Sequence, residues 1–457
     1  MQKMKNGKKV LSVCLSLAMA AGMLSTSAFA SWNVYGGSNN HNAVVTEAPT
    51  TPDKSGLDSY IQLHCTGSGW DGVDNVPVLQ TVNGTTYAYV LYDGYGASGA
   101  LVAKIRCAEN GGSSIVWTTD PYGTEGTSLN AKRGFQLSTP YLDDNGTPND
   151  ASDDTLYVGT ISQYDDYEGG EWLTGTGSKV MALTGLDQNK PTVTNVLTGI
   201  NGQINTPITT DGTYLYFGTW PGGSRAGTYY QVKLSDYSVK TFTPDSYGFY
   251  WAGAVSDGTN VYFGSDNGLL YWRSIADFDT TGGVLDLTDV ASDAGNVRST
   301  VMLDDGYLYF TTQGGYLWCC SYDDGLTVEW HIKLGATSTS TPTKVGDRIY
   351  VGYYSGFNAG GVQCVSADGS SVKTVVEGDG FPVQSSIVVM GDGTGTDYLY
   401  FNTNAQKGVG YCYSYDGTTG SQVWGTTGDT YALGGMAIDN GYAVFGNDYN
   451  HLYVVHD

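Results

Sequence analysis

One short phrase of aromatic and aliphatic residues recurs along the chain, each time after a turn rich in Asp and Gly. Residues 211–218 read Asp-Gly-Thr-Tyr-Leu-Tyr-Phe-Gly, and residues 257–264 repeat this phrase with two changes. Large apolar side chains stand at both odd and even positions, whereas a strand with one wet face alternates apolar with polar residues. The phrase therefore predicts a strand with both faces buried.

The spacing of the phrase predicts the architecture. Its central residue recurs at Tyr89, Tyr157, Tyr216, Tyr262, Tyr309, Tyr350, Tyr400 and Val444. The first two intervals are 68 and 59 residues and the later ones lie between 41 and 50. A period in the forties is typical of a propeller blade of four strands. We therefore predict an all-β fold, an eight-bladed β-propeller, or a seven-bladed one if the weak first unit is an insertion.

The inner and outer strands of each unit have signals of their own. Inner strands open with small residues and Pro at 138–140, 205–207 and 340–342, because the missing N–H of proline is not needed where a strand begins. Some outer strands end in a tryptophan after a glycine turn. We expect these tryptophans to tie neighbouring blades together: Trp117, Trp330 and Trp424.

The two ends of the chain suggest how the ring closes. The last unit, from Tyr431 to Asp457, has room for three strands only. We expect the N-terminal strand near residues 31–36 to supply the missing outer strand, because closure leaves no open sheet edge. The propeller domain is thus predicted to span residues 31–457.

Residues 1–30 are predicted to be a signal peptide. Four lysines precede an uncharged, largely apolar run from Val10 to Leu24, and Ala28-Phe29-Ala30 offers a cleavage site of the small-x-small type. No other stretch is apolar enough to span a bilayer. The sequence therefore predicts a secreted, extracellular protein with no membrane span.

Charge narrows the choice of partner. The formal net charge is −24, and the loss of four lysines with residues 1–30 makes it about −28 on the same counting. Such an acidic chain disfavours nucleic acid and anionic membrane surfaces as partners. We expect a monomer that binds an extracellular protein or a glycan.

The repeat resembles the PQQ-like, or quinoprotein-type, β-propeller repeat. The best copies run from Tyr411 to Gly417 before Trp424, and from Trp318 to Gly325 before Trp330. Many proteins of this family bind no cofactor and serve as scaffolds or binding proteins. The quinoprotein dehydrogenases need a calcium-bound quinone, an Asp base, carboxylate and amide ligands and a stacking Trp, and this set cannot be placed here residue by residue. The resemblance thus implies the fold, and we do not expect PQQ or another cofactor.

Cys319 and Cys320 are adjacent, and in quinoprotein alcohol dehydrogenases adjacent cysteines form a disulfide beside the quinone. Here the pair falls inside a predicted strand, where successive side chains point to opposite faces, and this disfavours a bridge. Whether the two residues form a disulfide stays open.

The acidic loops offer weak candidates for chemistry. Five aspartates of one insertion have the ligand type that calcium prefers, although the order of an EF-hand is missing: Asp143, Asp144, Asp150, Asp153 and Asp154. A solvated loop is the interpretation that we prefer for them. Paired carboxylates also permit glycoside hydrolysis, but turns rich in Asp supply such pairs by chance, and we assign no catalytic residue.

Aromatic residues near loop mouths are the better candidates for binding. They suit sugar or peptide recognition, with packing between blades as the alternative: Trp220, Tyr250, Trp251, Tyr353 and Tyr354. We therefore expect a secreted, non-catalytic propeller that acts as a protein- or glycan-binding or scaffold module. The alternatives are a PQQ-dependent dehydrogenase and an extracellular carbohydrate-active enzyme.

Overall fold

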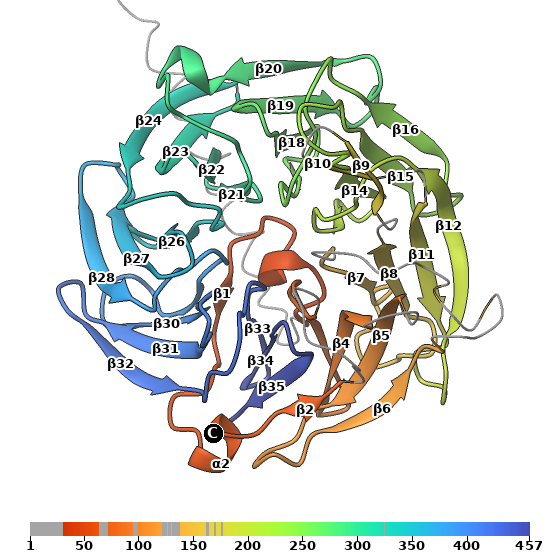
Figure 1. Cartoon of the computed structure of the whole chain (residues 1–457), viewed down its shortest axis with the longest axis vertical. Helices are drawn as coiled ribbons and strands as arrows, with labels where there is room; N and C mark the ends of the chain where they lie inside the picture. Colours follow the sequence, from red (N-terminus) through yellow and green to blue (C-terminus); the bar gives the residue numbers. More distant parts are fainter. Residues whose placement is uncertain are drawn as a thin grey trace, which may run out of the picture. The chain divides into compact units, whose positions relative to one another are not determined.

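Eight sheets stand around one axis in the unit formed by residues 31–457 (Figure 1): seven have four antiparallel strands, and one has a fifth, parallel strand at its inner edge. The computed structural model describes residues 31–63, 72–94, 99–120, 126, 129, 138–160, 164–168, 171–174, 177–323 and 325–457. The prediction of an all-β, eight-bladed propeller is confirmed. In every blade the phrase found in the sequence is the second strand.

The strands follow the chain from blade to blade. Blade one comprises β3 (Val78–Val82), β4 (Thr85–Gly94), β5 (Gly99–Arg106) and β6 (Ser114–Thr118), and blade two comprises β7 (Tyr141–Asp143), β8 (Thr155–Thr160), β11 (Ser178–Thr184) and β12 (Thr192–Ile200). Blade three comprises β13 (Thr209–Thr210), β14 (Tyr214–Gly218), β15 (Tyr229–Lys233) and β16 (Val239–Phe242). Blade four comprises β17 (Val255–Ser256), β18 (Asn260–Gly264), β19 (Leu269–Ser274) and β20 (Gly282–Asp286). A hairpin of β9 (Tyr164–Glu168) and β10 (Glu171–Thr174) is inserted in blade two.

The remaining four blades complete the ring. Blade five comprises β21 (Met302–Asp304), β22 (Tyr307–Thr312), β23 (Tyr316–Ser321) and β24 (Thr327–Lys333), and blade six comprises β25 (Thr343–Val345), β26 (Arg348–Ser355), β27 (Ala359–Ser366) and β28 (Val372–Asp379). Blade seven comprises β29 (Val388–Met390), β30 (Asp397–Asn402), β31 (Gly410–Tyr415) and β32 (Gly420–Gly425). Blade eight comprises β33 (Ala437–Asp439), β34 (Tyr442–Gly446), β35 (His451–Val455) and β2 (Ile61–Gln62). The only α-helix among the described residues is α2 (Lys54–Leu57), and none there is long and apolar enough to cross a membrane.

The closing strand lies elsewhere than predicted. Residues 31–36 form no strand; they lead into the short 3-10 helix η1 (Tyr35–Gly37). The outer strand of blade eight is instead β2, in which Ile61 pairs with Leu452. The sequence analysis chose the wrong segment because β2 is only two residues long and has no apolar alternation to mark it.

Residues 31–45 have a different role, because they fill part of the axis (Figure 1). The N–H groups of Leu79 and Leu142, in the inner strands of blades one and two, donate to the carbonyls of Trp32 and Asn33 at 2.8 Å. Further along, β1 (Val44–Val45) pairs in parallel with the inner strand β29. The segment thus satisfies strand edges that face the axis and have no neighbouring strand there.

The Asp of the repeated phrase holds its own turn. In blade three the Asp211 carboxylate accepts the N–H groups of Thr213 and Tyr214 and the hydroxyl of Tyr216, all at 2.7–2.8 Å. Asp257 in blade four makes the equivalent three bonds at 2.7 Å. These aspartates therefore bind the turn to a buried tyrosine, which explains why Asp and Tyr recur together.

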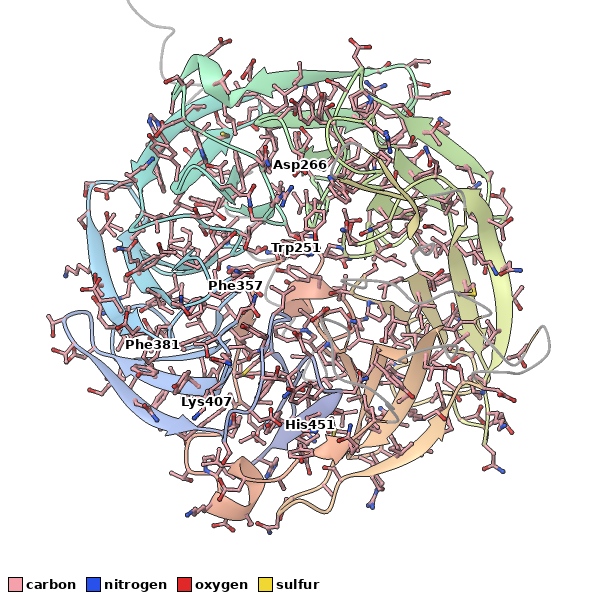
Figure 2. All side chains as sticks on the ribbon, in the orientation of Figure 1. Trp251, Asp266, Phe357, Phe381, Lys407 and His451 are labelled. Atoms are coloured by element: carbon pink, nitrogen blue, oxygen red, sulfur yellow. The ribbon has the colours of Figure 1, made fainter. Side chains whose placement is uncertain are left out.

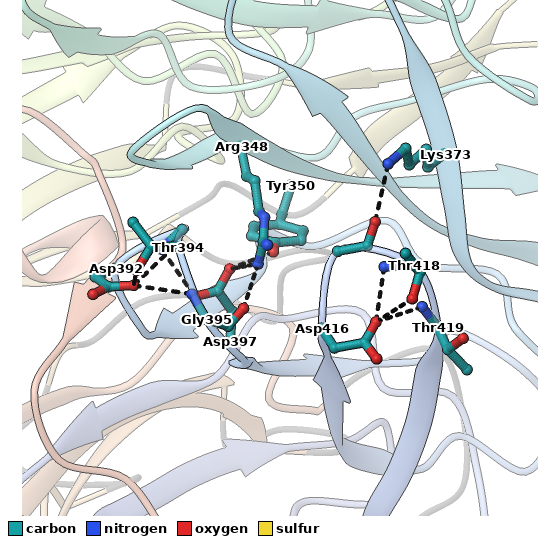
Figure 3. A network of polar contacts seen from close by, with 12 residues as sticks. Arg348, Tyr350, Lys373, Asp392, Thr394, Gly395, Asp397, Asp416, Thr418 and Thr419 are labelled. Carbon is teal, nitrogen blue, oxygen red and sulfur yellow. Dashed lines mark hydrogen bonds and ion pairs between the residues drawn. The ribbon is translucent and has the colours of Figure 1, made fainter.

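A related carboxylate joins two blades (Figure 3). Asp397 begins the second strand of blade seven and is fully buried. Its Oδ2 accepts from Arg348 Nη1 at 2.7 Å and from Tyr350 Oη at 2.6 Å, both in blade six. Close by, Lys373 Nζ donates to the carbonyl of Gly417 at 3.0 Å, across the same two blades.

The terminal tryptophans contact the unit that follows them around the ring. Trp117 Nε1 donates to the carbonyl of Leu186 in blade two at 3.4 Å. The ring of Trp330 lies against Gly369 in blade six, where a β-carbon would overlap it and where φ is +69°. Trp424 Nε1 donates to the carbonyl of Pro49 at 2.8 Å, because in blade eight the N-terminal segment stands in place of a turn between the third and fourth strands.

Candidate functional site

A cavity lies on the axis of the ring and receives residues from all eight blades. Each blade contributes residues that stand two to four positions before its inner strand. The lining includes Asp74, Asn75, Thr139, Asn205, Trp251, Arg298, Thr300, Thr339, Gln384, Ser385 and Leu433. Its empty volume is about 490 Å³, including space open to solvent. The positions that open the inner strands therefore build the site.

Hydroxyl groups at these positions hold neighbouring blades together around the axis. Ser138 Oγ donates to the carbonyl of Thr206 at 2.6 Å, from blade two to blade three. The N–H of Thr300 donates to Thr341 Oγ1 at 3.1 Å, from blade five to blade six. The small hydroxyl residues that precede several inner strands thus also serve to join neighbouring blades.

The cavity opens into a wider mouth on one side. Five residues line both spaces, and the mouth adds Tyr250, Gln313, Tyr354, Phe357, Asn404 and Asp448. The mouth has an empty volume of about 700 Å³, again including open solvent. Figure 2 shows Trp251 and Phe357 near the middle of the ring and Asp266 further out. We call the cavity and its mouth together the axial funnel.

The N-terminal segment closes the other side of the funnel. Tyr35 lines the cavity, and its hydroxyl lies 3.0 Å from Thr341 Oγ1. The segment also bonds to Leu79 and Leu142 in the inner strands of blades one and two. These two residues follow the cavity residues Val76 and Thr139 by three positions. The segment therefore fills the axis beyond the cavity, and the funnel ends blindly.

Trp251 stands in the wall of both spaces with an unusual backbone. Its φ is +58°, in the left-handed region that bulky residues rarely adopt. The carbonyl of Trp251 accepts from the N–H of Gly253 at 2.9 Å and from Thr300 Oγ1 at 3.4 Å. Its ring packs at 4.7 Å from that of Tyr250. Blades four and five thus fix the backbone of Trp251, and Tyr250 supports its ring.

Arg298 lines the funnel, and its charge is neutralised by Asp266. Its Nε and Nη2 donate to the two oxygens of Asp266 at 2.7 and 2.6 Å, and its guanidinium lies 4.4 Å from the ring centre of Tyr250. Burial raises the pKa of Asp266, although Arg298 opposes that rise. Burial also works against the charge of Arg298, but the carboxylate beside it raises its pKa overall. The pair of Arg298 and Asp266 thus contributes N–H donors to the wall of the funnel without adding net charge.

Several buried polar groups of the cavity have no hydrogen-bond partner among the described residues. Both amide atoms of Asn205 are in this state, and the side chain is 2% exposed. The same holds for Asn75 Oδ1 and Ser385 Oγ. Buried polar groups are normally paired, because an unpaired one costs about 1–3 kcal/mol. These groups mark the cavity as a place for polar molecules.

Four of the five predicted aromatic residues lie around the funnel. Tyr250, Trp251 and Tyr354 line it, and Trp220 packs edge-on against Tyr250 at 5.2 Å. Tyr353 does not: it is buried on the other face of β26, and its hydroxyl donates to Glu377 at 3.2 Å. Adjacent strand residues point to opposite faces, so Tyr353 and Tyr354 cannot serve one site.

The sequence analysis missed the polar residues of the funnel. Asn205 was noticed only as the opening of a strand, and Arg298 and Ser385 not at all. The signal that could have found them is their shared position before an inner strand, where all blades meet.

The carboxylates of the calcium candidate loop are largely used by the loop itself. Asp153 accepts from Asn145 Nδ2 at 3.1 Å and Thr147 Oγ1 at 2.8 Å, and Asp150 accepts from Ser152. Asp154 is buried and accepts from Gln80 of blade one. No three His, Cys, Asp or Glu side chains gather as a metal site in the described ranges. Calcium binding there stays a prediction.

Cys319 and Cys320 lie in the third strand of blade five, away from the funnel. Both are free and buried, and the strand pairs on both sides, with a bulge between the two residues against β24. Burial raises the pKa of Cys319 to about 12. The structure therefore gives them a packing role and no vicinal bridge.

The sequence matches no model of a known protein family and no curated protein. In structure, the chain is similar to BamB from Moraxella catarrhalis, with 14% identity and a TM-score of 0.51 over 88% of this chain and 99% of that one. It is also similar to a europium-containing methanol dehydrogenase, with 13% identity and a TM-score of 0.57 over 91% and 89%. Both are propellers of the PQQ type. This chain has a PQQ-like β-propeller fold. Sqt1 from Saccharomyces cerevisiae shares the architecture at 12% identity and a TM-score of 0.50 over 90% and 100%, and at such identities the likeness extends to the fold alone.

The quinone of the dehydrogenases does not fit the residues of this propeller. Trp251 offers a stacking surface, but a calcium-bound quinone also needs a group of carboxylate ligands. Asp266 is already paired with Arg298, and the part of the chain that is described contains no metal-ligand cluster. That the chain works without PQQ stays a prediction.

Proposed function

We propose that this chain is a secreted, non-catalytic binding module that holds an extracellular glycan or protein at its axial funnel. The funnel carries the proposal, because it combines an aromatic mouth with buried polar groups that have no partner in the described chain. Binding pockets of this size are commonly apolar with a few convergent polar groups. The predicted signal peptide, the acidic surface and an expected monomeric state are consistent with this role.

The use of the carboxylates favours binding over catalysis. Asp211, Asp257 and Asp397 recur in the repeat, and each is engaged with a turn or with a buried tyrosine. These three carboxylates thus have structural roles. We also infer membership of the PQQ-like repeat family, supported by the phrase, by the tryptophan contacts and by the two PQQ-type neighbours.

A glycan array and a pull-down from extracellular material test the proposal with residues 31–457. Phe357→Ala removes a ring that is 43% exposed at the mouth, so it should weaken capture with little effect on folding. Tyr307→Ala is the matched control, because Tyr307 is 37% exposed and begins a second strand, at the end away from the mouth. Capture that is equal in both variants would place the binding surface elsewhere.

A further inference from the structure

We propose that the blind end of the funnel takes the terminal unit of a neutral glycan, with its ring against Trp251 and its hydroxyls on Asn205 and Ser385. This inference rests on the proposed function and names the chemical class of its ligand.

The unpaired groups of the cavity match sugar hydroxyls. The Asn205 amide offers two donors and an acceptor, Ser385 Oγ offers both roles, and Asn75 Oδ1 accepts. A sugar hydroxyl also both donates and accepts, so one ring with several hydroxyls can satisfy all three residues. An apolar ligand would leave these groups unpaired at the cost of the desolvation already noted.

The charge of the funnel favours a neutral ligand. The guanidinium of Arg298 is held by both oxygens of Asp266, so it is not available as an uncompensated cation. The chain as a whole is acidic, with a formal net charge of −24. An anionic ligand is therefore repelled over a distance of about a Debye length. The other polar groups of the cavity wall are amides and hydroxyls.

The shape of the funnel favours the end of a glycan chain. Tyr35 and the segment behind it close the axis, so a chain cannot pass through the ring. The backbone of the wall residue Trp251 is fixed by bonds to its carbonyl from Gly253 and Thr300, and its ring packs against that of Tyr250. An aromatic ring that is held in place gives a sugar face a surface to stack on at little entropic cost. The ligand must thus enter end-first.

The unpaired state of Asn205 allows a clean test. Asn205→Ala removes no hydrogen bond within the described chain, so the variant should fold and melt like the native protein. Gln203→Ala is the matched control, because both amide atoms of Gln203 are also buried and unpaired, yet the residue lines neither space of the funnel. Trp251→Gly is a second variant, since glycine adopts the required positive φ without strain.

Residues 31–457 and the three variants are titrated by calorimetry with neutral oligosaccharides of glucose, galactose and mannose. Oligogalacturonate and choline chloride serve as charged probes, and all titrations are repeated in 0.5 M NaCl. We expect a neutral oligosaccharide to bind equally well at both salt concentrations. Binding should fall at least tenfold in Asn205→Ala and Trp251→Gly and stay unchanged in Gln203→Ala.

Four results would overturn the inference, and the last of them would also refute the proposed function. The first is sugar binding that both funnel variants retain, and the second is binding of a charged probe alone. The third is the absence of sugar binding in a protein that captures an extracellular protein partner through the funnel; in that case the proposed function stands. If neither glycan nor protein is captured at the funnel, both proposals fail.

Discussion

The buried carboxylate of Asp397 allows a sharp test of how the blades are held together. Asp397→Asn keeps the size of the side chain and removes its charge. In the native protein Oδ2 accepts from two donors, Arg348 Nη1 and Tyr350 Oη. In the variant an amide N–H₂, which is itself a donor, faces one or both of them. The bond from the N–H of Gly393 to Oδ1, at 3.0 Å, restricts rotation of the group away from this conflict.

The magnitude follows from burial. Removing one partner of a buried ion pair costs about 3–5 kcal/mol. The Asp397 side chain is 0% exposed, but that of Arg348 is 15% exposed and Nη1 also donates to the carbonyl of Gly395. Water and this second bond compensate part of the loss. We therefore expect Asp397→Asn to lower the free energy of unfolding by about 2–3 kcal/mol.

Asp392→Asn is the control from the same loop. Asp392 is exposed, and its Oδ1 accepts from Thr394 and Gly395 within its own turn, a role that an asparagine oxygen also fills. We expect a change of less than about 1 kcal/mol. Urea unfolding followed by tryptophan fluorescence measures both variants. Equal midpoints for the two variants would refute the view that this carboxylate joins blades six and seven.

Three further predictions concern buried groups. Burial raises the pKa of Asp154 to about 6, above the unfolded value, so the free energy of unfolding of the native protein decreases as pH rises from about 4 through 6. In urea, the free energy of unfolding of Asp154→Asn should equal that of the native protein at pH 4 and exceed it by about 2 kcal/mol at pH 8. A difference that does not change with pH would contradict this. Trp424→Ala should lower the free energy of unfolding by about 3–5 kcal/mol in the same assay. This loss should exceed that of Trp330→Ala, because Trp424 is buried and bonded to a carbonyl, whereas Trp330 is partly exposed. A larger loss for Trp330→Ala would contradict this interpretation of the contacts. Iodoacetamide should leave Cys319 and Cys320 unmodified in the folded protein and modify both in guanidinium without reductant; a requirement for reductant would reveal a disulfide.

The blade repeat could be predicted because its signals are local. Asp211, Gly212 and Tyr216 lie within six residues and make one hydrogen-bonded turn, so their recurrence counts the blades directly. The tryptophan contacts could also be expected, since a large ring at the end of an outer strand must find a neighbour.

The closing strand and the axial segment could not be predicted, because nothing local specifies them. Ile61 and Gln62 become a strand only by pairing with β35, almost 400 residues later in the chain. Trp32 and Asn33 are placed by bonds to the inner strands of two blades, far from them in the sequence. In both cases tertiary pairing decides the conformation, and the intrinsic preference of the segment does not.

For a similar reason, the sequence predicted aromatic residues of the funnel but not its polar residues. Aromatic residues such as Trp251 stand out where other blades have small residues, and that contrast drew attention to them. Asn205 looks like an ordinary strand opening in the sequence, and its unpaired amide becomes visible only when eight such openings meet on one axis.

Hydrogen exchange of residues 31–457, measured with and without the glycan or protein captured in the screen, tests the central claim most directly. A partner held in the axial funnel should slow exchange at 250–251, 384–385 and 433–435, which three separate blades contribute to the funnel. Slowed exchange on outer strands such as β6, β16 or β20, with those three segments unchanged, would contradict the account.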